Sequence, residues 1–128
     1  MNIEEILHFH LKREFPDYPG ELVHSACQEF EAVASLLCTD VRAKFPSSAN
    51  DSAILHDLPR LIQTDIATFA MLLYRLEHQL FISNPKNALL PFLSSLMRIR
   101  TGAELYYSTG IGPGCNIQHG VGTVIGPR

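Results

Sequence analysis

Hydrophobic residues recur every three or four positions through most of the first hundred residues, which places them on one face of an α-helix. Proline, glycine, serine and asparagine gather between these stretches and predict the turns that separate them. The pattern predicts helices over residues 2–14, 21–45, 51–57, 58–82 and 86–100. We therefore expect an all-α N-terminal domain over residues 1–100.

Local signals predict where these helices begin and end. Asn2 has the side chain of an N-cap, and Pro59 suits the first turn of the fourth helix. Pro91 either kinks the last helix or marks its true start. Thr101 and Gly102 end that helix.

The pattern changes after Gly102. Leu105, Ile111 and Ile117 are six residues apart, and glycines punctuate the intervals between them. Single aliphatic residues at this spacing are typical of a left-handed parallel β-helix, in which one side chain per short strand points into a narrow prism. The expected fold is mainly α, with the first coils of an incomplete left-handed parallel β-helix over residues 101–128.

The six-residue period slips near the end of the chain. The next inward aliphatic after Ile117 is Val124 or Ile125, one or two residues late. The slip falls just past His119, and an interrupted coil at a polar residue points to a functional site.

Composition narrows the possible partners and compartments. A formal net charge of -3 and a pI near 6.0 give no basic field, which argues against nucleic acid as a partner. No apolar run is long enough for a membrane span, and the N-terminus lacks the layout of a signal peptide, so we expect a cytoplasmic protein. Three cysteines without a CxxC pair argue against both a disulfide framework and a zinc site.

Three sequence blocks resemble the serine O-acetyltransferases, a hexapeptide-repeat acyltransferase family. They are YRLEHQLF at residues 74–81, the Thr101-Gly102 step, and IGPGCNIQHGVGTVIGPR at residues 111–128, which is similar to the family's IGxGxxIDHGTGVVIGET. The resemblance implies a helical domain followed by a β-helix. It also implies acetyl transfer from acetyl-CoA to the hydroxyl of L-serine, a step of cysteine biosynthesis, by a homotrimer or hexamer.

The same resemblance assigns the site residues. His119 takes the position of the general base, which accepts the proton of the attacking hydroxyl. Glu104 takes the position of the carboxylate that orients this histidine, where the family has aspartate. The alternative is that His119 fills a loop and Glu104 is a solvated charge. His78 is expected to be a packed residue that hydrogen-bonds across helices, and Cys115, four residues before His119, a packed thiol rather than a nucleophile.

Substrate recognition departs from the family. Gln118 replaces the aspartate that helps to hold the serine ammonium group, so a charge-assisted hydrogen bond is lost. The family's Asp-Pro segment should fall near residues 47–49, which contain neither residue. An O-acetyltransferase for a sugar or another alcohol therefore remains an alternative.

The family's second active-site histidine and its acetyl-CoA groove would lie beyond Arg128. We therefore expect these residues alone to be an incomplete, inactive portion. A helical oligomerisation or partner-binding module without catalysis is the other alternative.

Overall fold

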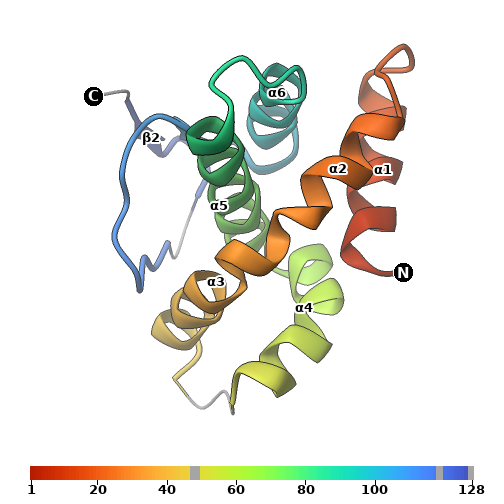
Figure 1. The fold of residues 1–128 in the computed structure, drawn as a ribbon. Helices are drawn as coiled ribbons and strands as arrows, with labels where there is room; N and C mark the ends of the chain where they lie inside the picture. Colours follow the sequence, from red (N-terminus) through yellow and green to blue (C-terminus); the bar gives the residue numbers. More distant parts are fainter. Residues whose placement is uncertain (47–49, 118–119, 127–128) are drawn as a thin grey trace.

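The computed structural model describes residues 1–46, 50–117 and 120–126, and within these ranges it is mainly helical (Figure 1). The elements follow in the order α1 (Ile3–Glu14), α2 (Glu21–Gln28), α3 (Phe30–Lys44), α4 (Asp51–Thr64), α5 (Ile66–Ser83), α6 (Leu90–Thr101), β1 (Glu104–Leu105) and β2 (Val124–Ile125). The expectation of a mainly α fold is confirmed.

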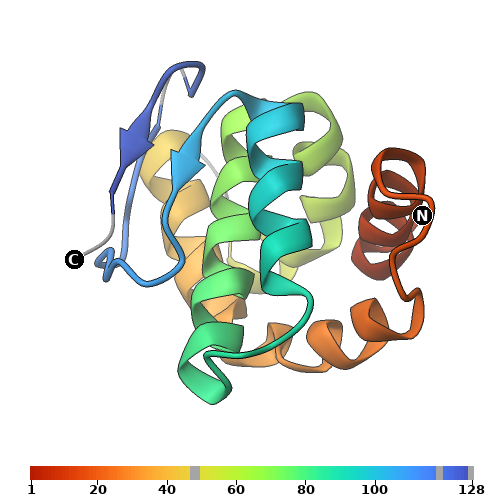
Figure 2. The same cartoon turned by 90° about the horizontal axis from the view of Figure 1, so that it is seen from above.

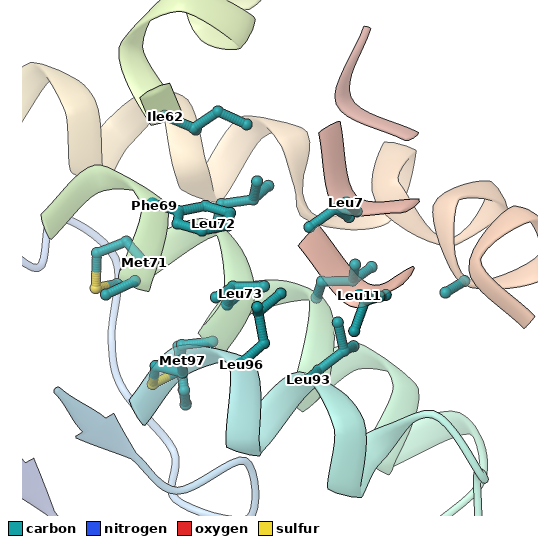
Figure 3. Close-up of a cluster of buried hydrophobic side chains, with 14 of the residues drawn as sticks. Leu7, Leu11, Ile62, Phe69, Met71, Leu72, Leu73, Leu93, Leu96 and Met97 are labelled. Atoms are coloured by element: carbon teal, nitrogen blue, oxygen red, sulfur yellow. The ribbon is translucent and has the colours of Figure 1, made fainter. Parts of the chain in front are cut away.

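Helix α5 is the centre of the fold. It packs against α2, α3, α4 and α6, and residues on every side of it are buried. A helix that is apolar around most of its circumference has to be enclosed in this way. Figure 2 shows α3 and the two strands to one side of α5 and α6, and α1 to the other. Leu73 of α5 lies near Leu96 and Met97 of α6 in the core, and Leu7 and Leu11 bring in α1 (Figure 3).

Several helix ends agree with the sequence signals. Asn2 caps α1 in a capping box: its Oδ1 accepts from the Glu5 N–H at 2.8 Å, and Glu5 Oε1 accepts from the Asn2 N–H at 3.1 Å. Pro91 lies in the first turn of α6, so it marks the start of that helix. Gly102 ends α6 in the left-handed conformation, with φ 69°.

Three predicted boundaries are wrong. The helix expected over residues 86–100 begins at Leu90. The helix expected over residues 21–45 is divided at Glu29 into α2 and α3. Pro59 lies inside α4 rather than at the start of a helix, and the boundary falls at Asp65. Asp65 prevails because its carboxylate caps α5, accepting from the Thr68 N–H at 3.1 Å, and also accepts from Lys44 Nζ at 3.0 Å.

After α6 the chain returns on itself, and we call the described residues of this segment, 103–117 and 120–126, the coil. Strands β1 and β2 pair in parallel, with Glu104 opposite Val124 and Leu105 opposite Ile125. The return therefore spans three six-residue steps plus a slip of two, and Ile125, not Val124, packs toward the core. One strand pair does not make a β-helix, and within the described ranges these two strands form the sheet.

None of the helices in the described ranges has the length and apolar character needed to cross a membrane.

Candidate functional site

The coil is attached to α5 by the YRLEH segment. The Tyr74 hydroxyl donates to the carbonyl of Thr109 and accepts from the Ile111 N–H at 3.0 Å. His78 Nδ1 lies 2.7 Å from the carbonyl of Tyr107. Because a carbonyl only accepts, His78 carries its proton on Nδ1. His78 is thus a packed residue, but its partner is the coil rather than another helix.

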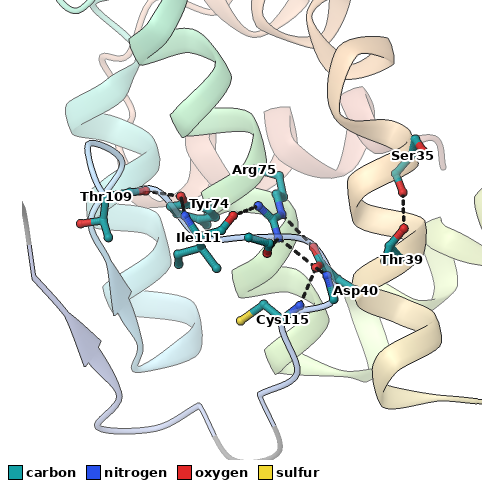
Figure 4. A network of polar contacts seen from close by, with 10 residues as sticks. Ser35, Thr39, Asp40, Tyr74, Arg75, Thr109, Ile111 and Cys115 are labelled. Atoms are coloured by element: carbon teal, nitrogen blue, oxygen red, sulfur yellow. Dashed lines mark hydrogen bonds and ion pairs between the residues drawn. The ribbon is translucent and has the colours of Figure 1, made fainter.

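A buried ion pair joins α3 to α5 beneath the coil (Figure 4). Arg75 donates to both carboxylate oxygens of Asp40, at 2.8 and 2.9 Å, and the two side chains are 3% and 2% exposed. A buried pair is stable only when its remaining donors and acceptors are also satisfied. Here Arg75 donates further to the carbonyls of Ile111 and Gly112, at 2.7 and 2.8 Å.

Asp40 also receives two backbone N–H groups of the coil. Its Oδ1 accepts from Gly114 at 3.0 Å and from Cys115 at 2.9 Å. Gly114 has φ 80°, a conformation in which consecutive N–H groups can converge on one anion. Asp40, Arg75, Tyr74 and His78, which we call the anchor, therefore hold residues 107–115 of the coil against α3 and α5.

The electrostatics of the anchor are those of a paired structural site. Burial acts to lower the pKa of Arg75, but the hydrogen bonds and the charge of Asp40 outweigh it, so the pKa lies above its ordinary value. Burial, and secondarily the Asp40 charge, raises the pKa of the Cys115 thiol. Cys115 therefore stays a protonated thiol at neutral pH, which agrees with the prediction that it is no nucleophile.

Glu104 is the predicted site residue that the structure describes. It opens β1, its side chain is 28% exposed, and Oε1 accepts from Arg98 Nη1 at 3.2 Å. Arg98 also donates to the Ser95 hydroxyl at 3.2 Å. Glu104 is thus held by a cation of α6, a partner that the sequence reasoning did not name. His119 and Gln118, and the predicted Asp-Pro position at residues 47–49, lie outside the described residues, so the Glu104–His119 dyad stays a prediction.

Sequence reasoning missed the buried Asp40–Arg75 pair, although the signal was present. Arg75 interrupts the apolar stripe of α5, and Asp40 lies on the core-facing side of α3 between Leu37 and Val41. Charged residues on buried faces are almost always paired. Among the described residues, no group of three or more histidine, cysteine, aspartate or glutamate side chains could hold a metal ion.

Comparisons of the chain with protein-family models, with curated proteins and with solved structures find no match. The resemblance to serine O-acetyltransferases therefore rests on the sequence blocks alone.

Proposed function

We propose that this chain supplies the acceptor side of an acetyl-CoA-dependent O-acetyltransferase, with L-serine as the first candidate acceptor. The observation that carries the proposal is the contact between two of the sequence blocks that resemble the family. Arg75 of the first block donates to the carbonyls of Ile111 and Gly112 of the last block, and the Tyr74 hydroxyl accepts from the Ile111 N–H.

The return of the chain after β1 also supports the proposal. Leu105 is buried and Ile111, Ile117 and Ile125 pack against the same core, as inward positions of one β-helical coil would. The parallel pairing of β1 with β2 is the pairing that successive coils require. We propose that the coil is the first turn of a left-handed β-helix, that the protein assembles through it as a trimer, and that a hexamer would form by pairing trimers through the helical domains.

In this proposal His119 is the general base for the acceptor hydroxyl. A hydroxyl is a weak nucleophile at neutral pH, and imidazole is the side chain whose pKa is closest to that pH. Glu104 orients His119 when it is not occupied by Arg98, and Gln118 contacts the acceptor. The reaction moves the acetyl group from sulfur to the acceptor oxygen and returns the proton to the thiolate of coenzyme A.

The test is an acetyl-transfer assay on the protein encoded by the complete gene, with acetyl-CoA and L-serine. We expect coenzyme A release that depends on L-serine, and loss of about 10²–10⁴-fold in kcat for His119→Ala. His56→Ala is the matched control, because His56 is exposed on α4, and it should keep the full rate. A His119→Ala rate equal to that of the control would overturn the assignment of the base.

The neutral Gln118 keeps a second acceptor class open. A sugar or another alcohol has no ammonium group and needs no carboxylate at this position. Turnover with such an alcohol but not with L-serine would assign the protein to that class.

A partner-binding or oligomerisation module without catalysis is the second candidate function. It rests on exposed large apolar side chains: Phe9 of α1 is 50% exposed, and Ile66 and Ile82 of α5, Ile99 of α6, and Val121 and Val124 of the coil are more than half exposed. Sedimentation of the chain as one discrete oligomer, together with no acetyl transfer by the complete protein, would favour this candidate.

A further inference from the structure

A carboxyl group lies inside the protein without a hydrogen-bond partner. Glu77 of α5 is 0% exposed, and neither of its two oxygens has a partner. Buried carboxylates normally pair with a cation or accept several N–H groups, as Asp40 does in the anchor. Among the described residues, Glu77 is therefore the one acidic or basic side chain that is fully buried and has no hydrogen-bond partner.

The position of Glu77 on α5 shows what encloses it. It is one helical turn from Leu73, which lies beside Leu96 and Met97 of α6 (Figure 3). It is also one turn from Tyr74 and Phe81, which contact the coil at Thr109 and Tyr107. Glu77 thus lies where α5, α6 and the start of the coil meet, and we call this place the junction.

The charged and titratable groups around the junction do little to stabilise the ionised form of Glu77. Arg98 of α6 acts on Glu77 and favours its ionised form, but its guanidinium is bound to Glu104 of β1. On the coil, Tyr107 packs against Phe81, and on α5 itself His78 is bound to the Tyr107 carbonyl. Burial dominates, and it raises the pKa of Glu77 well above its ordinary value.

We propose that Glu77 makes the junction sensitive to protonation: the neutral carboxyl lets α5, α6 and the coil stay packed, and loss of its proton to solvent loosens them. The change acts next to β1, so it also alters how Arg98 holds Glu104. Ionised Glu77 competes for the same guanidinium. The proposal does not depend on acetyl transfer, because it rests on burial and contacts alone.

The sign of the pH effect follows from linkage. Below the ordinary glutamate pKa of about 4.3, both folded and unfolded chains carry the proton, so the ionisation of Glu77 does not change the unfolding equilibrium. As the pH rises from there, the unfolded chain releases the proton first. The unfolding equilibrium constant then increases by up to about tenfold per pH unit, until the folded chain also ionises.

The experiment compares urea unfolding between pH 4 and pH 8 for the native chain, Glu77→Gln and Glu77→Met, with Glu31→Gln as the control. Glu31 is an exposed glutamate of α3. We expect the ratio of unfolding constants, native over Glu77→Gln, to rise with pH, and the ratio of native to control to stay constant. Glu77→Met removes the same proton with an apolar side chain of similar length, and it serves if the glutamine variant does not fold.

A direct titration of the native chain decides the question without any variant. With ¹³C-labelled glutamate carboxyls, the Glu77 resonance should titrate well above the ordinary glutamate pKa of about 4.3, and the amide signals of Leu105 and Tyr107 should broaden with the same midpoint. Titration of Glu77 together with the exposed glutamates would overturn the proposal. Unchanged amide signals across the Glu77 titration would overturn it as well.

Discussion

At the residue scale, the anchor shows why a buried charge can be tolerated. Asp40 accepts four hydrogen bonds from Arg75 and two coil amides, so little of its lost hydration is left uncompensated. Glu77, nearby on α5, has none. The two carboxyls therefore have opposite consequences for stability, although both are buried.

Removing one member of the buried pair should be strongly destabilising. Arg75→Leu leaves Asp40 buried without its cation, and we expect a loss of about 3 to 5 kcal/mol in the free energy of unfolding, measured by urea denaturation. Asp57→Asn breaks the exposed pair with Arg60 and is the matched control. It should leave the unfolding midpoint unchanged. An equal, small effect of both substitutions would show that the buried pair does not hold the fold.

The Tyr74 hydroxyl gives a milder test of the same anchor. Tyr74→Phe leaves the Thr109 carbonyl and the Ile111 N–H without a partner, and we expect a loss of about 1 to 3 kcal/mol by urea denaturation. Tyr106→Phe removes a hydroxyl from a tyrosine that is 37% exposed and should change stability little. A Tyr74→Phe protein as stable as Tyr106→Phe would exclude a structural role for the hydroxyl.

At the element scale, the end of α6 directs the chain into the coil. Gly102 has φ 69°, and a Cβ at this position would lie 3.3 Å from Val121 Cα. We expect Gly102→Ala to cost about 1 to 2 kcal/mol, because the left-handed conformation is strained for alanine. The measurement is thermal unfolding beside Gly110→Ala, whose Cβ would meet nothing within 4 Å. If both variants lost the same amount of stability, the left-handed backbone conformation of Gly102 would not be the cause.

How far the sequence predicts the elements depends on whether a signal is local. The N-cap at Asn2 and the end of α6 at Gly102 were predictable because a few neighbouring residues determine them. The N-cap at Asp65 carried the same kind of local signal, a carboxylate that accepts from the amide three residues later, but the prediction did not use it. Pro59 was taken as the start of a helix instead, whereas α4 continues through it.

At the scale of the whole molecule, the sequence predicted which coil residues face inward, but it did not predict how the coil is attached to α3 and α5. The six-residue spacing gave its inward residues, and the slip past Ile117 agrees with the pairing of Leu105 with Ile125. The anchor joins residues 29 or more positions apart, a distance at which no local pattern operates. The predicted base and its neighbour, His119 and Gln118, lie outside the described residues, so that part of the site stays a prediction.

If the anchor holds the coil in place as one unit, then loss of one anchor contact should also destabilise the hydrogen bonds between β1 and β2. Tyr74→Phe should then speed amide hydrogen exchange at Glu104 and Tyr106, which donate to Thr123 and Ile125 across the strand pair, as well as at Ile111. Exchange at the Leu11 amide in α1, distant from the coil, should change less. Faster exchange confined to Ile111 would show that the strands are held independently of the anchor, by contacts with α6 such as that between the Leu105 N–H and the Met97 sulfur.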